Sequence, residues 1–279
     1  SMKQHLELLY KIILHSKEYI LGSNRLKWYL LYRRYLIFAR NRNSKIVLIS
    51  SVPKTGSTYL SKLLAKSLGF KYSSLVSNFN QIEHDLYEPG IIDNFGKGII
   101  AHQHMRAADV NVEFILKYKI PTIVLIRNIY DTIVSIYDHT HNETFLWPMC
   151  HLNSQFFTKT TEEKYDIIID SFTPWILNFY NSWQDFATQG QAIIIKYESL
   201  INNKANTLKE IYFFLNKFGL EIKINDPEVS KEESRLNKGI EGRGLNTLTE
   251  KQIERINSFF INFREYNYES LGITKVLNV

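Results

Sequence analysis

From residue 45 onward, short apolar runs alternate with longer amphipathic stretches. Short runs rich in β-branched residues are typical of buried parallel strands, and four of them stand at 45–51, 98–101, 121–126 and 191–196. Each run precedes a stretch of helical periodicity, which predicts helices at 57–68, 108–118, 128–138 and 202–217. Strands alternating with helices predict right-handed βαβ units. We therefore expect an α/β fold in which helices flank both faces of one parallel sheet.

The first 44 residues read differently, as a basic helical extension with helices near 3–21 and 25–41. Residues 1–45 hold ten Lys or Arg against two Glu, so this segment carries +8 of a chain whose formal net charge is +6. The body is therefore at −2, which argues against a nucleic-acid partner. The predicted division is an extension at 1–44 and a domain at 45–279. The extension either packs on the domain or makes peripheral contact with a membrane.

Composition limits the classes of protein and of site. With 44% apolar and 22% charged residues, the chain can bury a large core. The single cysteine, Cys150, excludes an internal disulfide and a CxxC zinc site, and it favours a reducing, cytoplasmic location. No apolar stretch is long enough to cross a membrane.

Residues 139–160 lack a clear period and are predicted as a long loop, which over a site at the strand ends could act as a lid. This segment contains four residues of types that bind metals, namely His139, His141, Cys150 and His151. Their spacing fits no zinc pattern, so we interpret the histidines as exposed loop residues and expect no metal.

A candidate anion-binding loop joins the first strand to its helix. Gly56 permits close approach of the backbone, and a helix N-terminus offers unpaired N–H groups with partial positive charge. Ser57 and Thr58 add hydroxyl groups, and Lys54 adds a full charge. The loop is not a Walker A motif, because its lysine precedes a lone glycine. The alternative is an ordinary βα turn with a serine N-cap.

The sequence PKTGSTY at 53–59 resembles the PKSGTTW loop of the sulfotransferases that use 3′-phosphoadenosine 5′-phosphosulfate (PAPS). In that family the loop binds the 5′-phosphosulfate. The segment RNIYDTIVSIY at 127–137 is similar to the family's RNPxDxxxSxY, with Ile129 in place of proline. The resemblance implies that Arg127 and Ser135 hold the 3′-phosphate. It also implies a sulfotransferase fold related to P-loop NTPases, and a 5′-phosphosulfate site made of Lys54, Thr55, Gly56, Ser57, Thr58 and Tyr59.

Two further segments resemble the same family more loosely. Residues 196–200 are similar to its YEDL element, which implies that Tyr197 approaches the adenine. Tyr59 stands where the family has tryptophan, so it either stacks on the base or belongs to the core. Residues 237–244 are similar to RKGxxGxW, which implies that Lys238 and Gly239 close over the 3′-phosphate. Asn237 replaces the arginine and no tryptophan follows, so Arg235 and Arg243 are candidates to compensate.

The sequence HQH at 102–104 supplies the candidate base. Residues two apart lie on the same side of an extended segment. Aligned with the family's KTH, the segment implies that His104 is the catalytic base, and His102 remains the alternative. A neutral imidazole, of ordinary pKa about 6.5, accepts protons near pH 7. The resemblance further implies that Lys54 stabilises the leaving phosphate and that Ser135 restrains Lys54.

Together these features predict transfer of a sulfuryl group from PAPS to a hydroxyl or amine. The acceptor is left open as a small molecule, carbohydrate or lipid, and we expect residues 75–96, 139–160 and 225–250 to surround it. Two alternatives are a P-loop nucleotide kinase and a catalytically idle nucleotide-binding module attached to a membrane or partner.

Overall fold

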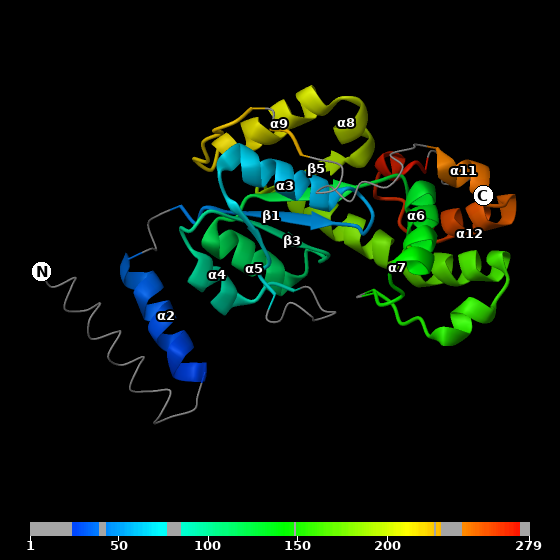
Figure 1. Ribbon diagram of the computed structural model, residues 1–279, viewed down its shortest axis with the longest axis horizontal. Helices are drawn as coiled ribbons and strands as arrows, with labels where there is room; N and C mark the ends of the chain where they lie inside the picture. The colour runs from blue at the N-terminus through cyan, green and yellow to red at the C-terminus, as the bar shows by residue number, and fades with distance from the viewer. Residues whose placement is uncertain are drawn as a thin grey trace, which may run out of the picture.

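The computed structural model describes residues 24–38, 43–76, 85–147, 149–225, 227–229 and 242–273 (Figure 1). The predicted helix at 3–21 and the predicted ligands Lys238 and Gly239 lie outside these ranges. Within them, five parallel strands form one sheet in the order β2-β3-β1-β4-β5. The strands are β1 (Ile46–Ser51), β2 (Lys71–Ser73), β3 (Ile99–Gln103), β4 (Thr122–Ile126) and β5 (Ala192–Lys196). The predicted α/β class is confirmed.

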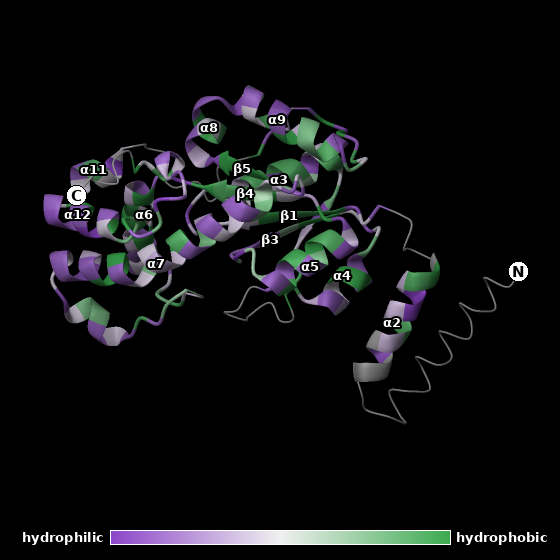
Figure 2. Ribbon diagram, turned by 180° about the vertical axis from the view of Figure 1, so that it is seen from behind, coloured by the Kyte–Doolittle hydropathy of each residue, from purple (hydrophilic) through white to green (hydrophobic). Residues whose placement is uncertain are grey.

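Helices cover both faces of the sheet, whose apolar strands lie between them in Figure 2. Val47 and Ile49 of β1 belong to the apolar cluster that includes α3 (Ser57–Leu68) and α9 (Lys204–Asn216). Leu48 belongs to the cluster on the opposite face, with residues of α5 (Asp109–Tyr118), α6 (Ile129–Asn142) and α7 (Thr161–Ala187). Every residue of β1 is buried. An apolar strand without alternation is expected when both faces are covered.

The predicted strands and helices agree with the structure to within a few residues, apart from three differences. β3 runs to Gln103, so His102 lies inside the strand rather than beyond it. α6 continues to Asn142, which places His139 and His141 on a helix. The predicted helix at 202–217 is α9, and a short helix that was not predicted, α8 (Tyr197–Asn202), precedes it.

Several elements have no counterpart among the predicted ones. β2 is three residues long and not apolar, so it carries no strand pattern. The others are α4 (Glu88–Asn94), α7, α11 (Arg243–Thr247), α12 (Glu250–Ser258), and two 3-10 helices at Ser154–Thr158 and Glu269–Leu271. α7 begins at a capping box between Thr160 and Glu163, which sets its first turn.

The N-terminal helix α2 (Asn24–Phe38) lies beside α4 (Figure 1). Leu31 and Tyr35 are buried, and the Tyr35 ring contacts Phe95 and Tyr118 edge-on, each at a centroid distance of 5.1 Å. The described part of the extension therefore packs on the domain. The boundary after residue 44 stays a prediction. No helix in the described ranges has the length and apolar character to span a bilayer.

Candidate active site

The carboxyl ends of β1, β3 and β4 bring the predicted site residues to one edge of the sheet. β1 pairs with both neighbours, and its last residue, Ser51, lies opposite Leu125 of β4. The loop after β1 carries Lys54, β3 ends beside His104, and Arg127 directly follows β4. Ligand sites of parallel α/β sheets form at this edge.

The loop between β1 and α3 has the backbone of an anion site. Gly56, at φ 75°, is the N-cap of α3, and Ser57 is its first helical residue, so the alternative of a serine N-cap is wrong. The Thr55 hydroxyl donates to the Val52 carbonyl at 2.7 Å and holds the loop closed. Lys54 has a φ of 65°, which is uncommon for a non-glycine residue. The first N–H groups of α3 are thus presented with lysine, serine and threonine.

Arg127 is buried, and it is held from two sides. Its Nη1 donates to the Lys54 carbonyl at 3.0 Å, and the guanidinium lies 4.6 Å from the centroid of the Tyr197 ring. Tyr197 therefore packs on the arginine, and its predicted contact with adenine stays a prediction. The absence of the family's proline at Ile129 has a structural solution, because the Asn128 side chain caps α6 by accepting from Tyr130 N and Asp131 N.

The two histidines of the HQH segment share Ser51. His104 Nδ1 lies 2.8 Å from the Ser51 carbonyl oxygen and 3.1 Å from its hydroxyl. His102 Nε2 contacts the same hydroxyl at 3.1 Å, and its Nδ1 contacts the Tyr72 hydroxyl at 3.4 Å. A carbonyl oxygen only accepts, so the His104 contact requires a proton on Nδ1. A neutral His104 then carries its lone pair on Nε2.

The Lys54 ammonium contacts two residues that the sequence analysis did not assign to the site. Its Nζ lies 3.3 Å from His139 Nδ1 and 3.8 Å from Glu143 Oε1. His139 follows buried Ser135 by one turn of α6, and Glu143 follows by another. The His139 side chain is only 16% exposed, so its interpretation as an exposed loop residue is wrong.

Residues 242–244, at the end of the glycine-rich segment 237–244, contact the first turn of α6. The Asp131 carboxylate accepts from the backbone N–H of Gly242 at 2.8 Å and of Gly244 at 2.7 Å. Arg243 forms an ion pair with Asp138 at 2.7 Å. This contact gives Arg243, one candidate for the missing phosphate ligand, a role in holding α11 on α6.

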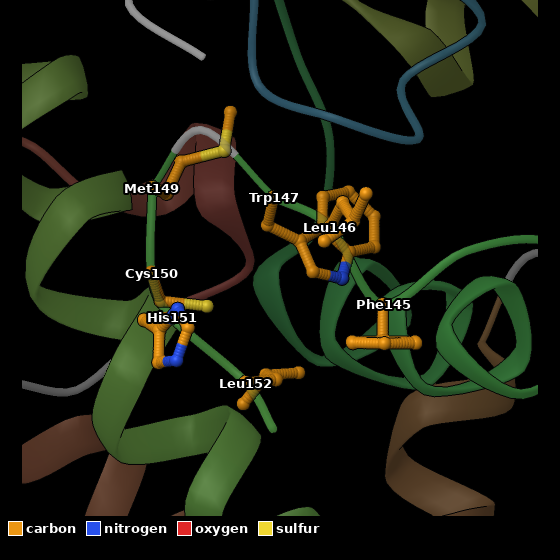
Figure 3. Close-up of a pocket in the computed structure, with 7 residues that line it drawn as sticks. All are labelled: Phe145, Leu146, Trp147, Met149, Cys150, His151 and Leu152. Carbon is orange, nitrogen blue, oxygen red and sulfur yellow. The ribbon is translucent and has the colours of Figure 1, made fainter. Parts of the chain in front are cut away.

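A pocket of about 230 Å³ lies beside His139 (Figure 3). It is lined by Phe145, Leu146, Trp147, Met149, Cys150, His151 and Leu152. The Trp147 ring lies 5.0 Å from that of His139, and its Nε1 donates to Thr140. Burial raises the pKa of the Cys150 thiol to about 12, so it stays protonated and is a poor nucleophile near neutral pH.

The described residues were compared with the arrangements of side chains that bind metal ions. No group of three or more His, Cys, Asp or Glu among them is arranged to hold an ion. His139, one of the four residues of metal-binding type in 139–160, contacts Lys54 and Glu143.

Comparison with known proteins assigns the family. The sulfotransferase domain family matches residues 44–265, which is most of the chain. The chain belongs to this family. Its fold matches that of a mouse sulfotransferase, SULT7A1, solved with PAP, with a TM-score of 0.58, 15% identity, and coverage of 82% of this chain and 87% of that chain.

Two more distant structures also match this sulfotransferase-family chain. They are retinol dehydratase in complex with retinol and PAP (TM-score 0.49, 12% identity, 83% and 85% coverage of this chain and that one) and the sulfotransferase domain of the curacin biosynthetic pathway (TM-score 0.39, 15% identity, 76% and 95%). No curated protein sequence matches the chain.

The sequence contained one usable sign of the missed residues. Ser135, His139 and Glu143 are spaced four apart, as expected for one face of a helix. Because the predicted helix stopped at 138, the last two were not recognised as part of that face. Ser51 and Tyr72 carried no comparable sign, because only the pairing of β1, β2 and β3 brings them to the histidines.

Proposed function

We propose that this protein transfers a sulfuryl group from PAPS to a hydroxyl or amine of an acceptor. The observation that carries the proposal is the contact between the two anion-binding segments, in which Arg127 donates to the Lys54 carbonyl. A bisphosphorylated nucleotide needs positive charge at two separate phosphates, and these segments supply one cation each. The first turn of α3 adds further hydrogen-bond donors for a phosphate group, namely Ser57, Thr58 and the N–H groups of the helix N-terminus.

The proposed base is His104. Its Nδ1 donates to the Ser51 carbonyl, and this bond orients the ring and leaves the proton-accepting lone pair on Nε2. Nε2 takes the proton from the acceptor hydroxyl or amine as that atom forms its bond to sulfur. His102 has both ring nitrogens in contact with hydroxyl groups, of Ser51 and Tyr72, which suits a supporting role.

The proposed role of Lys54 is electrostatic. PAPS supplies the activated sulfuryl group, whose bond to the bridging oxygen breaks as the new bond to the acceptor forms. The electron pair of the broken bond stays on the phosphate of the product, 3′-phosphoadenosine 5′-phosphate (PAP). The Lys54 ammonium donates a hydrogen bond to that oxygen, and this interaction strengthens as negative charge develops.

The acceptor site is proposed to include the pocket of Figure 3. The pocket adjoins His139 through Trp147, and His139 contacts Lys54. Its lining is mostly apolar, which favours an acceptor with an apolar body over a polar sugar. A small molecule, a carbohydrate and a lipid remain the classes to compare.

Two measurements test the function. PAP should raise the thermal unfolding temperature in a concentration-dependent way and ATP should not, since Arg127 and its partners are matched to a 3′-phosphate. Transfer of labelled sulfate from PAPS to pooled phenols, steroids, lipid alcohols and sugars should be at least about 100-fold slower in Lys54→Ala, the loss expected for an electrostatic stabiliser. Stabilisation by ATP with phosphate transfer would support the kinase, and PAP binding without transfer would support the idle module.

A further inference from the structure

Three groups meet where α6 ends against the loop after β1. His139 Nδ1 lies 2.9 Å from Glu143 Oε1 and 3.3 Å from Lys54 Nζ, and Nζ lies 3.8 Å from the same carboxylate oxygen. Lys54 and His139 are each 16% exposed, whereas Glu143 is 52% exposed. We call these three residues the Lys54 cluster.

The contacts at Nδ1 set two demands that one nitrogen cannot meet together. A carboxylate only accepts and an ammonium only donates, so Nδ1 needs a hydrogen toward Glu143 and a lone pair toward Lys54. The contact with Glu143 is the shorter one, which favours Nδ1–H donating to the carboxylate. Glu143 then fixes the orientation and tautomer of His139 and attracts the Lys54 ammonium through its charge.

We propose that His139 and Glu143 are positioning residues for Lys54, and that a proton on His139 raises the positive charge which the Lys54 cluster offers to the donor. This inference rests on the proposed function, because it gives Lys54 an anionic donor to bind. With neutral His139 the charges of Lys54 and Glu143 cancel. With protonated His139 the cluster carries +1, so an anion binds more tightly.

The surroundings of His139 allow this change of charge. Among the residues that the structure describes, Lys54 from the loop after β1 and Glu143, the C-cap of α6, are charged groups in contact with it. The uncharged Trp147 ring packs against it from the following segment. The preceding residue, Asp138, is paired with Arg243 of α11. Binding of an anion therefore favours the protonated ring, and binding should be accompanied by uptake of a proton.

The first experiment separates positioning from packing. His139→Phe keeps an aromatic ring beside Trp147 but removes Nδ1, and kcat should fall about tenfold, since small displacements of a catalytic group are costly. His139→Asn restores a hydrogen-bonding group near the position of Nδ1 and should keep kcat at pH 8 within about threefold of wild type. The matched control is His141→Phe, because His141 is an exposed histidine on the same helix that stacks on Tyr137.

The second experiment measures PAP affinity by calorimetry at pH 8 and pH 6, in buffers of different ionisation enthalpy. His139→Asn differs from wild type only in the side chain at position 139, so the difference in pH dependence between these two proteins reports on His139. On going from pH 8 to pH 6, the PAP affinity of wild type and of His141→Phe should increase at least about threefold more than that of His139→Asn. Both proteins should also take up more protons on binding than His139→Asn. Equal pH dependence in wild type and His139→Asn would overturn the proposal.

A third variant, Glu143→Gln, should change PAP affinity in the opposite direction from a substitution that merely disrupts the structure. Glu143→Gln keeps a hydrogen-bond acceptor but removes the negative charge, so PAP should bind about two- to fivefold more tightly, as expected for a partly exposed charge. The kcat should nevertheless fall, since Lys54 loses its anchor. Weaker PAP binding would contradict the proposal.

If wild type itself neither binds PAP nor transfers sulfate, the proposed function fails. If it does both while His139→Phe behaves like His141→Phe, this inference alone fails.

Discussion

At the scale of single residues, Ser51 links the candidate base, His104, to the loop between β1 and α3. It is the last residue of β1, three positions before Lys54, and its carbonyl and hydroxyl both contact His104. A hydrogen bond to the backbone holds a ring more rigidly than one to a mobile side chain, because the strand cannot rotate away. The position of the base is therefore set by the pairing of β1 with β3.

Substitution of the histidines should separate their roles. His104→Ala should lower kcat by about 100-fold or more, the contribution expected of a general base, with little change in PAP affinity. His102→Ala should cost much less, since its ring contacts Ser51 and Tyr72. Steady-state kinetics at saturating PAPS measure both. Near-normal activity of His104→Ala with an inactive His102→Ala would shift the alignment of HQH by two residues.

Arg127 should act mainly on nucleotide binding. Arg127→Ala removes the cation proposed for the 3′-phosphate and the bond to the Lys54 carbonyl, so PAP affinity should fall by at least about tenfold, in line with a charge-assisted hydrogen bond. Calorimetric titration with PAP and with adenosine 5′-phosphate, which lacks the 3′-phosphate, provides the measurement. The loss should be large for PAP and small for the second nucleotide. Equal losses would remove the assignment to the 3′-phosphate.

At the scale of elements, α6 serves the site along one face. Asp131, Ser135, His139 and Glu143 follow one another at four-residue spacing, and they hold in turn the glycine-rich segment, the predicted phosphate contact and the Lys54 ammonium. Because a helix is rigid, a shift of this element would move all of these contacts together.

The docking of α11 on α6 depends on Gly244. A Cβ at this position would lie 2.2 Å from the carbonyl carbon of Tyr130, so Gly244→Ala must push α11 away from the N-terminus of α6. We expect a loss of roughly 1–3 kcal/mol in the free energy of unfolding, as for an overpacked core, together with weaker PAP binding. Gly90→Ala is the control, since a Cβ there would meet its nearest neighbour at 3.6 Å. Denaturant unfolding and PAP titration of both variants decide it, and equal behaviour would contradict the prediction.

At the scale of the whole molecule, the parallel sheet places the site at one edge and the N-terminal helix elsewhere on the body. α2 turns Leu31 and Tyr35 inward and leaves basic and apolar side chains exposed, namely Lys27, Tyr29, Arg33, Arg34 and Ile37. Exposed aromatic and basic residues on one helix are compatible with an anionic lipid surface. Packing on the body and contact with a membrane are therefore not exclusive, and the membrane contact stays a prediction.

Charge reversal tests that contact without removing the packed helix. The double variant Arg33→Glu/Arg34→Glu should lose most of its co-sedimentation with vesicles that contain phosphatidylserine, since each basic residue near such a surface contributes about 1 kcal/mol. Lys209→Glu/Lys251→Glu changes the same number of exposed charges on α9 and α12 and should keep its binding. No binding of wild type, or equal binding of both variants, would restrict α2 to packing.

The sequence by itself determined the βαβ order, because buried parallel strands and the helices between them have distinct periodicities. It also located Lys54, Arg127 and His104, since each lies within three residues of the end of a strand and belongs to a recognisable motif. It did not reveal β2, whose three residues become a strand only by pairing with β3.

The tertiary structure decided which groups meet. Periodicity describes one element at a time, whereas the contacts of Lys54 with His139 and Glu143 join a loop to a helix that begins 75 residues later than the lysine along the chain. Ser51 is likewise an ordinary strand residue until β3 brings two histidines beside it. Local sequence fixes the type of each element and the chemistry it carries, and only the packing of the sheet and its helices fixes the distances on which that chemistry depends.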